Sequence, residues 1–132
     1  MNETPLAGLP EVTDAEKFAD AAVATWHDVY AALSPIIGPG GVAALYRRSL
    51  SLRLADYPWL ANVSECPLPP GDFSALRREL SQQTIADPVA TNGALLRSFS
   101  QLLTNLIGAS LTARLLQSVW EKHGHTVQDT SP

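Results

Sequence analysis

The chain has 132 residues, of which 45% are hydrophobic and 17% are charged, and its formal net charge is −4. This length fits one domain with a core of its own, and the negative charge argues against a nucleic-acid partner. No apolar run reaches the roughly 18 residues of a membrane span, and the lone Cys66 permits no intrachain disulfide and fits a reducing, cytoplasmic location.

The first predicted helix follows a loose arm. Residues 1–12 have no apolar periodicity, so we interpret them as a flexible arm. Thr13 and Glu16 have the spacing of a capping box, which predicts a helix start. Apolar residues then recur every three or four positions, at Phe18, Ala22, Trp26, Val29 and Leu33. Pro35 disfavours the helical conformation in Ser34, so we expect the helix to end there.

A second helix is predicted after the glycine-rich turn at 38–41. It covers about 41–57, with one apolar side formed by Val42, Tyr46, Leu50, Leu54 and Tyr57. Arg53 falls inside this apolar arc, and Pro58 is expected to end the helix. The proline-rich segment 61–71 is the one long loop that we predict.

Two further helix starts are marked by aspartates. Asp72 is a good N-cap for a helix with a thin apolar stripe, at Phe73, Leu76, Leu80 and Thr84. We expect that helix to pack at the edge of the domain. Asp87 and Pro88 mark the next start, with Asn92 as the alternative because Gly93 weakens the first turn.

The longest apolar-periodic stretch runs from 94 to 121. Its first half has one apolar face, formed by Leu95, Leu96, Phe99, Leu102, Leu103 and Leu106. Past Gly108 the face turns by roughly half a turn of the helix. Either the helix stops at Gly108 and restarts near Ser110, which we favour, or it continues and contacts different partners on each side. The polar tail is 124–132.

The sequence therefore predicts a single all-α domain over 13–123. We expect a bundle of four to five helices with a break or bend near Gly108. We identify no strand with convincing alternation and no internal repeat.

No catalytic residue, metal site or cofactor is predicted. His123 and His125 have no third ligand close in sequence, and Cys66 has no neighbouring base. The absence of catalytic groups and the excess of apolar periodicity together favour an interaction or regulatory domain. We predict a homodimer, or a complex with another protein, through Leu111, Leu115, Val119 and Trp120, helped by the first helix.

A second hypothesis is a ligand-sensing bundle for a small anionic or amphipathic molecule. Its pocket would be lined by Trp26, Tyr46, Tyr57 and Phe99, with Arg53 as the polar anchor. An Arg53 that is buried beside a cavity without a carboxylate partner would favour this hypothesis.

A third and weaker hypothesis is a phosphorelay or other signalling accessory domain. Its phosphoacceptor would be His27, which the helical angle places on the exposed side of the first helix. The residues after His27 lack the Lys and Gly that usually follow the phosphoacceptor of such domains, and Asp28 would repel a phosphoryl group.

Overall fold

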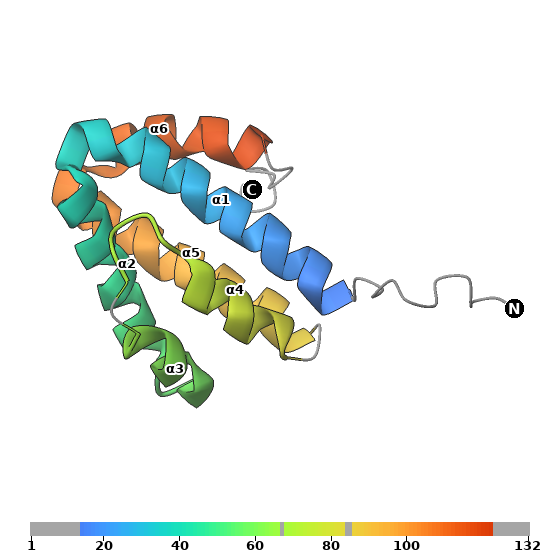
Figure 1. Cartoon of the computed structure of the whole chain (residues 1–132). Helices are drawn as coiled ribbons and strands as arrows, with labels where there is room; N and C mark the ends of the chain where they lie inside the picture. Colours follow the sequence, from blue (N-terminus) through green and yellow to red (C-terminus); the bar gives the residue numbers. More distant parts are fainter. Residues whose placement is uncertain (1–13, 67, 84–85, 123–132) are drawn as a thin grey trace, which may run out of the picture.

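The computed structural model describes residues 14–66, 68–83 and 86–122 and shows an all-α fold in them (Figure 1). In order, these residues form α1 (Asp14–Ile37), α2 (Pro39–Arg53), a 3-10 turn (Pro58–Leu60), α3 (Ala61–Ser64), α4 (Ser74–Ser81), α5 (Ala86–Ile107) and α6 (Ala109–Lys122). The described part contains six α-helices rather than four to five, and no strand. The predicted arm 1–12, the capping residue Thr13 and the tail 124–132 lie outside it.

Helix α1 continues past Pro35, where we expected it to end. Pro35 has no N–H to donate to the Ala31 carbonyl. The side-chain hydroxyl of Ser34 donates to the neighbouring Tyr30 carbonyl at 2.7 Å. The helix ends one turn later at Gly38, whose N–H donates to the Ser34 carbonyl at 2.8 Å. The preference of a residue before proline is therefore overridden here, and Ser34 stays helical.

Two consecutive helices meet at a sharp corner at Gly38 and again at Gly108, and the two corners have the same backbone geometry. Gly38 has φ +83° between α1 and α2, and Gly108 has φ +94° between α5 and α6. Each glycine N–H donates 2.8 Å to the carbonyl four residues earlier, and each glycine carbonyl accepts 3.1 Å from the N–H four residues later. The chain thus contains two matched helix–glycine–helix units, a correspondence that we did not identify from the sequence.

The two helix–glycine–helix units pack against each other. Helix α1 packs against α2 and α6, and α5 packs against the same two helices. Exchanging α1 with α5 and α2 with α6 preserves these pairings, so the four helices contact one another in a symmetric pattern. Both corners lie at the same end of the molecule, on the left in Figure 1.

Helix α4 packs along α1 more extensively than any other pair of helices does, and it also contacts α3 and the 3-10 turn. Its position at the edge of the domain stays a prediction. Its buried side chains include Ala75, Leu76 and Leu80, and Phe73 is buried just before its start. The apolar stripe of α4 is thin, but every apolar side chain on it is buried.

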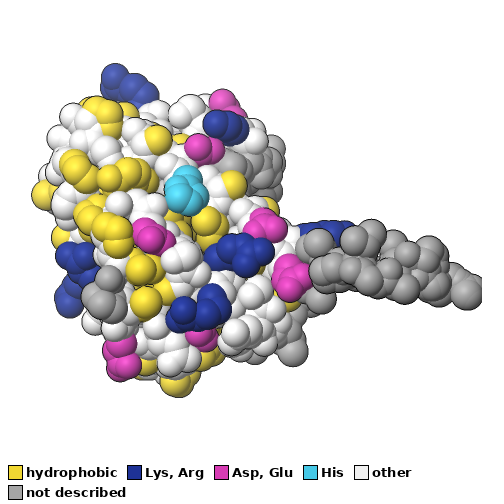
Figure 2. All heavy atoms as spheres, in the orientation of Figure 1, with side chains coloured by type: hydrophobic (Ala, Val, Ile, Leu, Met, Phe, Trp, Pro, Cys, Tyr) yellow, Lys and Arg dark blue, Asp and Glu magenta, His cyan; other side chains and the backbone are white. Residues whose placement is uncertain are grey.

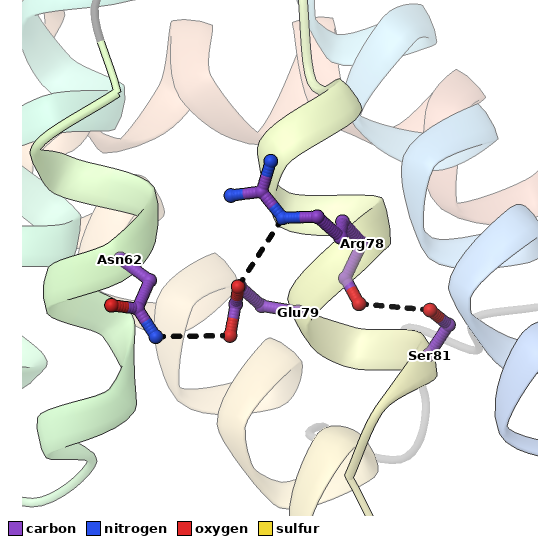
Figure 3. Close-up of polar contacts among 4 residues, drawn as sticks. All are labelled: Asn62, Arg78, Glu79 and Ser81. Atoms are coloured by element: carbon purple, nitrogen blue, oxygen red, sulfur yellow. Dashed lines mark hydrogen bonds and ion pairs between the residues drawn. The ribbon is translucent and has the colours of Figure 1, made fainter.

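The second predicted helix and the predicted loop also differ from the structure. Helix α2 starts at Pro39 and ends at Arg53, and a turn follows in which the Tyr57 N–H donates to the Arg53 carbonyl at 2.9 Å. The expected loop 61–71 begins with the single-turn helix α3. Figure 3 shows how α3 is held: Asn62 donates to the buried Glu79 of α4 at 3.2 Å, and Arg78 donates to the same carboxylate at 3.3 Å.

Candidate functional site

Three of the four predicted pocket aromatics meet in the core. The Trp26 ring contacts Tyr46 and Phe99 edge-on, with ring centroids 5.2 and 5.3 Å apart. Phe73, which we had not assigned to this group, packs against Tyr46 at 5.0 Å and Trp26 at 6.0 Å. Such edge-to-face contacts fill the centre of the domain, and Trp26 is fully buried there.

Arg53, the predicted anchor, lies apart from this cluster. Its Nε donates to the Ser98 hydroxyl of α5 at 2.8 Å, and its guanidinium pairs with Asp56 at 3.6 Å. Arg53 and Tyr57 are both half-buried, and neither lines the cavity or the groove described below. In this position Arg53 links the end of α2 to α5 by a hydrogen bond. Ligand binding by Arg53 stays a prediction.

The structure places a different cavity beside Tyr46, with a volume of about 40 Å³. The walls come from α1, α2, α3, α4 and the segment between α3 and α4. They include Tyr30, Val42, Arg47, Leu50, Val63, Cys66, Asp72 and Phe73. The segment between α3 and α4 runs upward past α2 and then down to α4 (Figure 1), and its residues 68–73 form part of the cavity wall.

Tyr46 lines this cavity, and its hydroxyl is a buried polar atom. Among the residues that the structure describes, its hydroxyl has no hydrogen-bond partner and is inaccessible to solvent. Burial raises the pKa of Tyr46 well above its usual range, and the nearby Asp72 carboxylate raises the pKa further. The phenol therefore stays protonated and can donate a hydrogen bond at any physiological pH.

An open groove adjoins the cavity across residues 70–73 and contains His27. The His27 ring lies edge-on to Phe73 at 5.2 Å, and Asp72 and Arg77 line the same groove. Figure 2 shows the histidine (cyan) on this face among acidic and basic side chains. Arg77 also pairs with Asp20 of α1 at 2.6 Å. Phosphorylation of His27 stays a prediction.

Asp72 connects the groove to α4. Its carboxylate accepts from the Ser74 N–H at 2.9 Å, at the start of that helix. Hydrogen bonds from the Ser74 hydroxyl and N–H lower the pKa of Asp72, and the charge of His27 adds to this effect. Asp72 is therefore ionised near neutral pH and gives this wall of the cavity a negative charge.

The four residues of the predicted homodimer contact lie on α6, against the body of the domain. Val119 is only 3% exposed, and Leu111, Leu115 and Trp120 are half-buried. Leu115 and Trp120 pack partly on the core. Much of the apolar surface that we attributed to a partner therefore contacts α1 and α5 of the same chain, and the homodimer contact through these residues stays a prediction.

The exposure or burial of several residues was not predicted from the sequence. Ile36, which we expected to lie beyond the first helix, is 50% exposed, and Leu106, which belongs to a predicted apolar face, is 59% exposed. Asn92, considered only as a helix start, is buried and accepts from the Trp26 indole at 2.8 Å. Helical periodicity assigned Leu106 to the core, because periodicity gives the face on which a side chain lies and not whether a neighbour covers that face.

Residues 14–66, 68–83 and 86–122 hold no group of three or more His, Cys, Asp or Glu side chains suited to a metal ion. Across the same residues, no helix combines the length and hydropathy of a membrane span. His123 and His125 lie outside the described residues. Comparisons of this chain with known proteins found no matching family model, no similar curated protein and no similar solved structure.

Proposed function

We propose that this protein is a helical interaction domain that forms a homodimer through the end where its two corners lie. The observation that carries the proposal is the exposure of Ile36 and Leu106, 50% and 59%, two residues before each corner glycine. Exposed large apolar side chains that gather in one place are a common mark of a protein contact. Hydrophobic side chains are seen at this left end in Figure 2.

The corner segments are also free of charge. No Asp, Glu, Lys or Arg occurs in 29–46 or in 98–113, although 17% of the chain is charged. The centres of protein interfaces are depleted of charged residues. A surface without charge meets a second copy of itself without repulsion, which favours a homodimer over a partner that is selected by charge.

The proposed contact lies nearer the start of α6 than the contact that we predict from the sequence. Leu111 lies in the first turn after Gly108 and is half-buried, so it belongs to the edge of the proposed contact. Val119 is nearly buried within the chain, so its contribution to a dimer would be small.

Light scattering over a range of micromolar concentrations tests the proposal. We expect twice the monomer mass for the natural chain, and the double variant Ile36→Ser/Leu106→Ser should raise the dimer dissociation constant at least about tenfold. The matched control is Leu52→Ser/Val89→Ser, which removes two apolar side chains of 46% and 48% exposure away from the corners. A monomeric natural chain, or equal weakening by both double variants, would refute the proposed contact.

A further inference from the structure

Asn92 and Gly93 form a chemically labile pair. The backbone nitrogen of a glycine can attack the side-chain amide carbon of an asparagine directly before it, because glycine has no Cβ to hinder the approach. The other asparagines of the chain precede residues with larger side chains, in the pairs Asn2-Glu3, Asn62-Val63 and Asn105-Leu106. Asn92 is therefore the asparagine of this chain that loses its amide group most readily.

The folded chain holds this pair in a conformation that cannot react. Both residues lie inside α5, where each backbone N–H donates to the carbonyl four residues earlier. The Asn92 side chain is buried, and its Oδ1 accepts from the Trp26 indole at 2.8 Å. Attack by Gly93 requires the Asn92 backbone to rotate out of the helical conformation and its amide to leave Trp26. The reaction therefore needs local opening of α5.

We propose that Asn92 is a deamidation site that is closed in the folded domain and reacts when α5 opens. The Gly93 nitrogen loses its proton and forms a bond to Cγ of Asn92, and the side-chain nitrogen leaves as ammonia. Water then hydrolyses the cyclic imide, and the ring opens at either carbonyl to give aspartate or isoaspartate. The net change is the gain of a water and the loss of an ammonia. This proposal does not depend on the homodimer.

Either product disfavours refolding. Aspartate at position 92 places a carboxylate in the core beside the fully buried Trp26, and burial of a charge is costly. Arg97, whose guanidinium lies beside Gly93, is exposed, so a carboxylate that pairs with it must leave the buried position. Isoaspartate lengthens the backbone by a methylene and interrupts the hydrogen bonds of α5. Deamidation therefore marks a chain that has opened, and the mark is irreversible.

The test is incubation of the full chain at neutral pH, folded and in urea, with the mass of each asparagine-containing peptide followed over time. We expect Asn92 to deamidate in urea, and to do so at least about tenfold more slowly in the folded chain, because only the opened fraction reacts. Asn62 and Asn105 are internal controls. Both are exposed in the fold, and both should react more slowly than Asn92 in urea.

Two variants separate the reaction from its consequence. Gly93→Ala should slow deamidation in urea severalfold, and its added Cβ would lie in ordinary contact with Arg97, 3.5 Å from Nη1. The matched control is Gly40→Ala in α2, which should leave the rate unchanged. Asn92→Asp reproduces one product and should lower the urea midpoint.

Four results would overturn the proposal. They are an intact Asn92 after incubation in urea, equal rates in the folded and unfolded chains, an unchanged rate in Gly93→Ala, and a natural urea midpoint in Asn92→Asp.

Discussion

At the scale of single residues, the buried polar groups most strongly restrict how the side chains of this core are arranged. The Trp26 indole donates to Asn92 at 2.8 Å, and the two side chains are 0% and 3% exposed. The hydrogen bond joins α1 to α5 next to the contacts of Trp26 with Tyr46 and Phe99. It therefore fixes the orientation of the central ring as well as satisfying its donor.

We predict that Asn92→Ala lowers the free energy of unfolding by roughly 1–3 kcal/mol. The substitution leaves the Trp26 N–H buried without an acceptor, which costs the desolvation of that group. Urea denaturation measures the change. The matched control is Asn105→Ala on the same helix, where the side chain is exposed and alanine is the better helix former. A loss that is equally large in both variants would contradict the role of the hydrogen bond.

A pH-dependent contribution is expected from Asp72. Its pKa is lowered in the folded state by the hydrogen bonds from Ser74, so it stabilises the fold above its unfolded pKa, and this stability is lost as the pH falls through the folded value. Asp72→Ala should therefore lower the thermal midpoint at pH 7, and its difference from the natural chain should shrink below about pH 4. Circular dichroism at several pH values measures both. A difference that does not vary with pH would contradict this assignment.

At the scale of elements, the two corners define the fold. A positive φ at Gly38 and Gly108 lets each helix stop and the next begin without an intervening loop. A Cβ added at either glycine would meet no atom within 4 Å, so only the backbone conformation opposes a larger residue.

We predict that Gly108→Ala destabilises the protein by about 1–2 kcal/mol, the cost of a left-handed conformation for an L-residue. Gly40→Ala is the matched control, since Gly40 is helical and has equally open surroundings. It should stabilise the protein by about 0.4–1 kcal/mol through the unfolded state. Thermal melts followed by circular dichroism measure the two shifts. Changes of the same sign would show that the φ value at Gly108 is not the deciding factor.

At the scale of the whole molecule, the two helical units pack extensively against each other. Helix α1 packs on α6 and α2 packs on α5, so each unit supplies the partner surface for the other. An ion pair between Lys122 and Asp28, at 3.4 Å, adds to the contact of α6 with α1. Folding of one unit is therefore coupled to folding of the other.

We accordingly predict a single cooperative unfolding transition in denaturant. Helix content and tryptophan fluorescence should give the same midpoint, because Trp26 lies in the shared core. Repeating the measurement at two protein concentrations separates unfolding from dissociation of the proposed dimer. Two transitions with different midpoints would show that the units fold independently.

The sequence by itself determined the all-α class. The apolar spacing from Phe18 to Leu33 marks the face of α1 that packs inward, since 3.6 residues per turn makes such spacing specific to a helix. The aromatic residues Trp26 and Phe99 were also recognisable as a group, although as a pocket lining rather than as a filled core. The residues that form one face of a helix lie within a few consecutive turns, so a local sequence pattern is enough to predict these features.

Only the tertiary structure decided which helices meet and which groups are left without partners. The close packing of α4 on α1 depends on contacts between segments far apart in the chain. The cavity beside Tyr46 and the exposure of Ile36 and Leu106 depend on them as well. Periodicity shows that a side chain is apolar and which face it lies on, whereas burial depends on the neighbour that covers this face.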